Sequence, residues 1–172
     1  TTMPQVAAEA LHMDLEKISV APVDTAMTPY DKTTTSSRST FHSGNAILEA
    51  CADIKRQLCR LAAVKWGCAA EDVTYTAEGY IQSVKDPARR IHINEVGKSG
   101  ILHEQEPVLA IGRYGTSDIF DPPPVEGRQS KRPTVMWMIG AQAAVVKVNP
   151  VTGRVKVAKM GAAHDVGKAI NP

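Results

Sequence analysis

A run of hydroxyl side chains with one guanidinium contains the residue types best suited to binding chemistry. The run covers residues 33–40 and includes Arg38, and Ser43 and Gly44 follow at the start of an amphipathic stretch. Ser43 is a suitable N-cap for a helix there. The unpaired N–H groups and positive dipole end of a helix start favour phosphate or a similar anion. The pattern therefore predicts an anion site, where Arg38 donates a charge-assisted hydrogen bond and Gly44 lets a ligand approach the backbone.

The same run also fits a solvated Ser/Thr linker before an ordinary capped helix, and the pattern alone favours this plainer interpretation. A second polar cluster contains His164 and Asp165. These two residues are candidates for an acid–base or metal pair. However, no third ligand stands at a metal spacing, so a satisfied pair of loop residues is the favoured interpretation.

The element that must position the hydroxyl run is a long helix from Ser43 to about residue 66, with Gly67 as its C-terminal stop. Its apolar stripe consists of Ile47, Ala50, Cys51, Ile54, Leu58 and Leu61. The three cysteines of the sequence, Cys51, Cys59 and Cys68, form no CxxC motif and cannot all pair. They indicate a reduced, cytoplasmic protein in which they are small buried apolar residues and not metal ligands.

Weaker patterns predict the remaining elements. We expect a helix over residues 3–13, strands over 18–22, 73–84 and 107–114, a strand or short helix over 91–96, a surface loop over 118–133 and an irregular tail over 161–172. The strongest strand signal is a hairpin, residues 144–148 and 154–159, around a five-residue turn that ends in Gly153. The fold class is α+β: mixed strands, one long amphipathic helix and a C-terminal β-hairpin, in a single domain over residues 1–172.

Composition narrows the class of protein further. The 172 residues are 43% hydrophobic and carry a net charge of +2, which predicts a globular fold and gives no case for nucleic-acid or membrane binding. No apolar run reaches the roughly 20 residues of a membrane helix, and no signal peptide is recognisable. Neither end resembles a natural terminus, so we expect a fragment of a longer protein.

An ordered set of short motifs spans nearly the whole sequence. It consists of Gln5 to Leu11, Asp24-Thr25, Thr28 to Asp31, Ser36 to Thr40, Gly44 to Ala46 and Ala163 to Pro172. In this order and spacing they resemble the molybdenum-binding large subunit of the xanthine dehydrogenase, aldehyde oxidase and carbon monoxide dehydrogenase family. The stretch from residue 67 to 133 is much less diagnostic.

The resemblance implies a larger molybdopterin-binding domain and a molybdenum–molybdopterin cofactor, in bacteria often the cytosine dinucleotide form. It also implies iron–sulfur and flavin (FAD) domains or subunits as partners. The parent enzyme would be a molybdenum-dependent oxidoreductase that hydroxylates an aldehyde, an aromatic heterocycle or a related small molecule with oxygen from water. The cofactor-binding residues carried over are Thr35, Ser36, Ser37, Arg38, Ser39, Gly44, Asn45 and, more weakly, Asp165. The family's catalytic glutamate lies beyond the position of Pro172, so this chain alone is expected to be inactive.

Two functions from other classes remain open at this stage. One is a stand-alone phosphate- or nucleotide-binding domain with its ligand at the start of the helix at Ser43. The other is a structural module whose hairpin, residues 144–159, docks a neighbouring domain.

Overall fold

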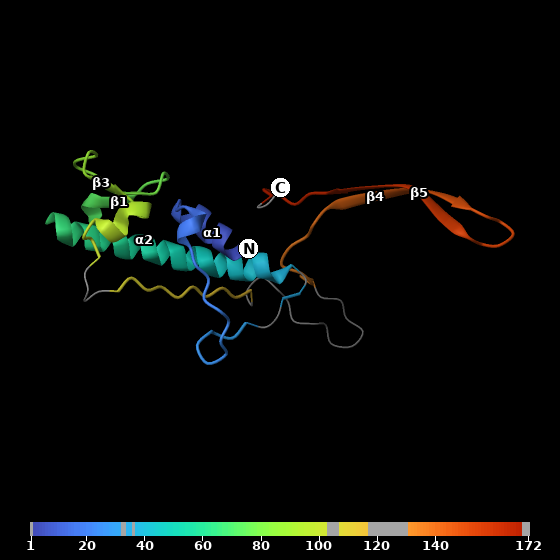
Figure 1. The fold of residues 1–172 in the computed structure, drawn as a ribbon, viewed down its shortest axis with the longest axis horizontal. Helices are drawn as coiled ribbons and strands as arrows, with labels where there is room; N and C mark the ends of the chain where they lie inside the picture. The colour runs from blue at the N-terminus through green and yellow to red at the C-terminus, as the bar shows by residue number, and fades with distance from the viewer. Residues whose placement is uncertain (1, 32–33, 36, 103–106, 117–130, 170–172) are drawn as a thin grey trace. The chain divides into compact units, whose positions relative to one another are not determined.

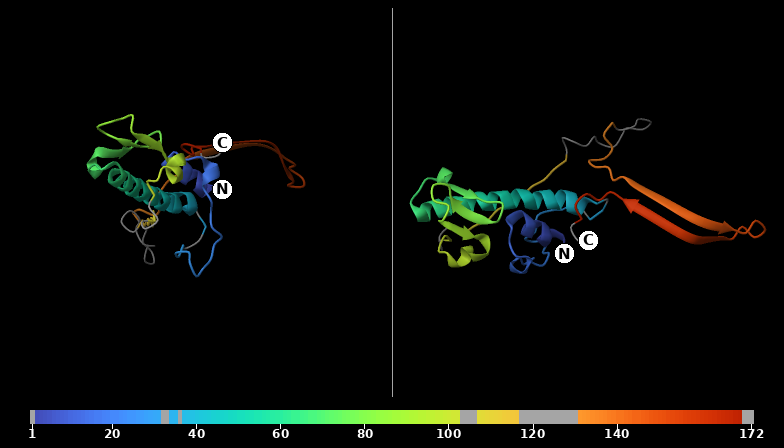
Figure 2. Two further views of the ribbon diagram at one scale, coloured as in Figure 1. Left: turned by 60° about the vertical axis from the view of Figure 1, so that its left-hand side comes forward. Right: turned by 90° about the horizontal axis from the view of Figure 1, so that it is seen from above.

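The chain folds into two compact units, residues 1–115 and 116–172. The structure is a computed structural model that describes residues 2–31, 34–35, 37–102, 107–116 and 131–169 (Figures 1 and 2). Helices and antiparallel strands occur together, with a long helix in the first unit and a hairpin in the second, so the predicted α+β class is confirmed. The expected single domain over residues 1–172 stays a prediction.

The first unit is built around α2, Gly44–Trp66, a helix of 23 residues. The predicted helix is confirmed, and Gly67 ends it with φ 65° and an N–H that donates to the carbonyls of Ala63 and Val64. Glycine adopts this left-handed conformation without the steric cost of a Cβ. The stripe also behaves as predicted, because Cys51, Leu58 and Leu61 are buried.

A three-stranded antiparallel sheet covers the C-terminal half of α2 (Figures 1 and 2). Its strands are β1 (Val73–Tyr75), β2 (Tyr80–Ser83) and β3 (Arg90–His92), in the order β1-β2-β3. The single strand predicted over residues 73–84 is therefore wrong: a turn at Gly79, with φ 81°, divides it into β1 and β2. The ambiguous stretch at residues 91–96 contains both alternatives, because β3 is followed by the 3-10 helix η4, Ile93–Lys98.

The core of this unit lies between α2 and the sheet. Its buried members are Leu58, Leu61, Ala62, Ala63, Val73, Ile81, Ile93 and Ile101. A further short 3-10 helix, η3 (Ala70–Asp72), connects α2 to β1.

The N-terminal helix α1, Thr2–Leu11, packs against α2, which confirms the helix predicted over residues 3–13. The strand predicted over residues 18–22 is wrong. A 3-10 helix, η1 (Leu15–Lys17), ends there, and the chain continues without joining any strand that the structure describes. Residues 19–22 are exposed and Val20 is 69% exposed, so no burial of apolar side chains favours pairing with a strand. The contacts just before these residues are instead a hydrogen bond from the Asp14 N–H to Asn94 Oδ1 and one from Lys17 Nζ to the Asn94 carbonyl.

The second unit contains a β-hairpin formed by β4 (Gly140–Val148) and β5 (Val155–His164). The predicted hairpin is confirmed and is longer than expected, since the tail is a strand as far as His164. Gly153 at the turn has φ 68°, and Asn149 Oδ1 accepts the N–H groups of Val151 and Thr152. Both faces of the hairpin are exposed within the described residues.

Candidate functional site

The helical backbone at the predicted anion site begins earlier than the sequence suggests. A π-helical turn, η2 (Ser39–Ser43), precedes α2 without a break. Ser43 therefore has helical dihedral angles, φ −68° and ψ −33°, and its side chain makes no capping hydrogen bond within the described part of the chain. The predicted Ser43 cap is wrong because the helix continues through this residue. π-Helical turns are rare and often occur at functional sites.

The described residues just before the π-helical turn make short-range hydrogen bonds. Ser37 has φ 60°, in the left-handed region that non-glycine residues seldom occupy. The Arg38 N–H donates to the Thr35 carbonyl at 2.9 Å, and Ser39 Oγ donates to Thr34 Oγ1 at 3.2 Å. The structure thus brings Thr35, Ser37, Arg38 and Ser39 together at the start of one helix.

Ser36, the remaining member of the predicted loop, lies outside the described residues. Its assignment to the cofactor stays a prediction.

Gly44 and Asn45 lie at the junction of the π-helical turn and α2. Gly44 is buried, yet an added Cβ there would meet no atom within 4 Å, so the space beside its backbone is open. Asn45 Nδ2 donates to the Phe41 carbonyl at 2.6 Å, which joins the first turn of α2 to the middle of the π-helical turn. Asn45 therefore stabilises the turn whether or not it also contacts a ligand.

Sequence reasoning missed an aromatic cluster at the π-helical turn. The rings of Phe41, His42 and Tyr114 meet edge to face, with centroid separations of 5.3 to 6.0 Å. Phe41 and His42 belong to the turn itself, whereas Tyr114 comes from a segment about 70 positions later. No pattern of local spacing in the sequence connects Tyr114 with Phe41 and His42. The one sequence feature that pointed to these aromatic residues was their scarcity, since aromatics make up 5% of the chain.

Asp165, the last predicted site residue, belongs to the second unit. Its N–H donates to the Ile139 carbonyl and its Oδ1 accepts the Gly167 N–H at 3.0 Å, so its carboxylate organises a local turn after β5. The assignment of Asp165 to the cofactor site stays a prediction.

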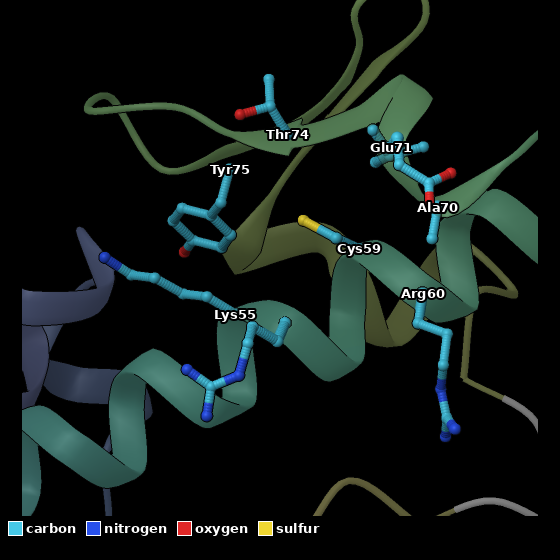
Figure 3. A pocket seen from close by; sticks show the side chains of 9 residues that line it. Lys55, Cys59, Arg60, Ala70, Glu71, Thr74 and Tyr75 are labelled. Atoms are coloured by element: carbon cyan, nitrogen blue, oxygen red, sulfur yellow. The ribbon is translucent and has the colours of Figure 1, made fainter.

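A hollow of about 460 Å³ lies elsewhere in the first unit, between α2 and β1 (Figure 3). It is lined by residues that include Lys55, Cys59, Arg60, Thr74 and Tyr75, and it contains none of the predicted site residues. Figure 3 shows the Arg60 side chain extending away from Thr74 and Tyr75. Burial raises the pKa of the Cys59 thiol, which keeps it protonated and disfavours metal binding.

Two findings on the described residues bear on wider classes of function. They contain no group of three or more His, Cys, Asp or Glu side chains placed to hold a metal ion. Nor is any described helix both long enough and apolar enough to cross a membrane.

Comparison with known proteins defines the class to which this architecture belongs. The whole of residues 1–172 matches the family described as the molybdopterin cofactor-binding domain. The chain belongs to this family, which confirms the resemblance inferred from the ordered motifs.

Two curated relatives are similar over the full chain. The large subunit of nicotine 6-hydroxylase from Paenarthrobacter nicotinovorans is 28% identical over 178 residues, and the probable hypoxanthine oxidase XdhD of Escherichia coli K12 is 27% identical over 173 residues. The chain covers 20% and 16% of the lengths of these proteins.

Among solved structures, the Cu,Mo-dependent carbon monoxide dehydrogenase in its carbon monoxide-reduced state has the same fold. It matches the whole chain with a TM-score of 0.75 at 24% identity, and the chain covers 20% of it. The reconstituted carbon monoxide dehydrogenase from Oligotropha carboxidovorans matches with a TM-score of 0.74, also at 24% identity.

Proposed function

We propose that this chain forms part of the cofactor site of a molybdenum hydroxylase, a larger enzyme that oxidises an aldehyde, an aromatic heterocycle or a related small molecule. The observation that carries the proposal is the hydroxyl-rich turn with Arg38 at the start of α2, in a chain that matches a molybdopterin cofactor-binding domain from end to end. When bound, the molybdenum cofactor supplies the redox centre at which the substrate is hydroxylated with oxygen from water.

The residues at the π-helical turn fit such a group. A molybdopterin carries a phosphate, and the first turn of a helix presents N–H groups and a positive dipole end to an anion. Ser37 is exposed, Arg38 and Ser39 are half-buried, and the space beside Gly44 is open. Hydroxyl donors, one guanidinium and an accessible backbone are therefore gathered at one helix start.

In this proposal the chain binds and orients the cofactor. The residues that would hold it are Thr35, Ser36, Ser37, Arg38, Ser39, Gly44 and Asn45, with Asp165 shaping a neighbouring loop. Arg38 would donate charge-assisted hydrogen bonds to the phosphate, while the serine and threonine hydroxyls would bond polar atoms of the pterin portion. No residue of this chain is proposed as the catalytic base.

The finer features of the parent protein belong to the same proposal. They are the cytosine dinucleotide form of the cofactor, iron–sulfur and flavin (FAD) partners that remove the electrons, and a cytoplasmic location. The similarity to the large subunit of nicotine 6-hydroxylase supports the presence of partner subunits.

The test is the molybdenum content of the protein expressed from its uninterrupted reading frame in a host that makes the cofactor. We expect about one molybdenum per chain. Loss of a charge-assisted hydrogen bond should leave Arg38→Ala with roughly a tenth of that content. A matched control is Arg56→Ala, because Arg56 is exposed on α2 and pairs with Asp53 at 2.9 Å, away from the turn. Unsubstituted protein without molybdenum would overturn the proposal.

A further inference from the structure

Residues 107–114 lie along α2 in an extended conformation, although they join no strand among the described residues (Figure 1). The strand predicted here is therefore wrong, and the reason is that a helix side chain takes the place of a neighbouring strand. The Leu109 N–H donates to Gln57 Oε1 at 3.3 Å, and Gln57 Nε2 donates to the Leu109 carbonyl at 2.8 Å. One amide side chain thus satisfies both backbone groups of Leu109.

The 107–114 segment makes two further contacts closer to the start of α2. A Cβ on Gly112 would overlap the Ala46 carbonyl oxygen and lie 2.6 Å from the carbonyl carbon, so only glycine fits this approach. Beside it, the Arg113 N–H donates to Glu49 Oε2 at 2.7 Å. The segment is therefore held against α2 from Gln57 back to Ala46.

The last residue of this segment reaches the π-helical turn. The Tyr114 ring lies 5.6 Å from the Phe41 ring and 6.0 Å from the His42 ring, both edge to face, between centroids. The turn thus has two supports: Asn45 bonds the Phe41 carbonyl from within the helix, and Tyr114 packs on it from outside. π-Helical turns are rare, and an uncommon backbone conformation persists where its surroundings stabilise it.

We infer that Tyr114 is a positioning residue for the cofactor, which acts by holding the π-helical turn and therefore the loop of Ser37, Arg38 and Ser39. This inference rests on the proposed function. Tyr114 itself supplies no donor to the cofactor. Its contribution is the ring, so the hydroxyl group is dispensable.

The experiment uses the protein from the uninterrupted reading frame with Tyr114→Ala, Tyr114→Phe or Tyr80→Ala. Tyr80→Ala is the matched control, because Tyr80 also makes an edge-to-face contact, with His92 at 4.9 Å, but lies on β2 and not at the turn. The readouts are molybdenum and released pterin per chain, the melting temperature, and amide hydrogen exchange over residues 39–45. Amide exchange at the π-helical turn, and recovery of cofactor content in Tyr114→Phe, report on how the turn is positioned. They do not depend on the overall stability of the protein.

We expect Tyr114→Ala to keep roughly a tenth of the cofactor, in line with the loss of a residue that orients a ligand-binding group. Exchange at residues 39–45 should become faster, and Tyr114→Phe should restore both properties. Tyr80→Ala should lower the melting temperature and leave cofactor content unchanged. Equal cofactor loss in Tyr114→Ala and Tyr80→Ala would overturn the inference about Tyr114, and so would an unchanged cofactor content in Tyr114→Ala. Either result would leave the proposed function standing. Unsubstituted protein without cofactor would overturn the proposed function and this inference together.

Discussion

Tyr75 shows at the scale of one residue how a side chain fixes two elements. Its hydroxyl donates to the Leu11 carbonyl at 2.6 Å and so joins β1 to the end of α1, while Lys55 Nζ lies 4.9 Å from the centre of its ring. Burial raises the pKa of Tyr75 far above its ordinary value. The neutral phenol is therefore the form that the folded protein stabilises.

Stability should consequently fall at alkaline pH. A group whose pKa is raised by folding contributes stability that is present below its ordinary pKa, about 10 for tyrosine, and that is lost as pH rises above it. Burial also raises the pKa of Cys51 and Cys59, so the decline should begin near their ordinary value of 9.0. We expect the unfolding free energy of Tyr75→Phe to be about 1 kcal/mol lower than that of the unsubstituted protein at neutral pH. Above pH ~10 the unfolding free energy of the variant should fall less steeply with pH.

The measurement is denaturant unfolding of both proteins at a series of pH values. Alkaline slopes that are identical in the unsubstituted protein and Tyr75→Phe would contradict the assigned role of Tyr75.

At the scale of elements, α2 serves two purposes along its length. Its C-terminal half contributes Leu58, Leu61 and Ala62 to the core, and its N-terminal end continues directly from the π-helical turn. The 107–114 segment contacts α2 between Ala46 and Gln57. The approach of this segment depends on Gly112, where a side chain has no space. The close contact between α2 and the 107–114 segment thus requires a residue without a Cβ at position 112.

Gly112→Ala should separate the segment from α2 and lower the unfolding free energy by about 1 to 3 kcal/mol, the usual cost of overpacking. Gly97→Ala is the control, because an added Cβ at Gly97 meets no atom within 4 Å and its backbone is not in the left-handed region. Thermal melts of the two variants test this difference. The same melting temperature in both variants would show that the segment is not packed as described.

At the scale of the whole molecule, the second unit lacks a core of its own within the described residues. Valine side chains on β4 and β5 are roughly half exposed, including Val146 at 47% and Val157 at 57%. An isolated two-stranded hairpin is marginally stable in water, and contiguous exposed apolar surface marks contact with other protein. Since the chain spans 20% of the nicotine 6-hydroxylase subunit, we expect further parts of a longer protein to cover this hairpin.

Hydrogen exchange tests this expectation. Amides of β4 should exchange rapidly in the 172-residue chain and become protected in the longer protein, whereas amides of α2 around Leu58 should be protected in both. Protection of β4 that is equal in the two proteins would show that the hairpin needs no further cover.

Local patterns in the sequence determined the elements whose stability is local. The amphipathic stripe and Gly67 predicted α2, the turn chemistry around Gly153 predicted the hairpin, and the hydroxyl run with Arg38 indicated the candidate site. The ordered motifs also identified the family. The helix and hairpin signals succeed because helix periodicity and turn preferences depend on residues that are close in sequence. The assignment of the hydroxyl run to the cofactor stays a prediction.

Tertiary structure alone decided what depends on distant partners. Residues 107–114 have a strand-like pattern, but Gln57 engages the backbone of Leu109 in place of another strand. The helical backbone begins at the π-helical turn and not at Ser43, where the sequence predicted its start. Tyr114, from a distant part of the chain, packs against this turn. Neither outcome follows from local preference, because the deciding contacts join residues more than 50 positions apart.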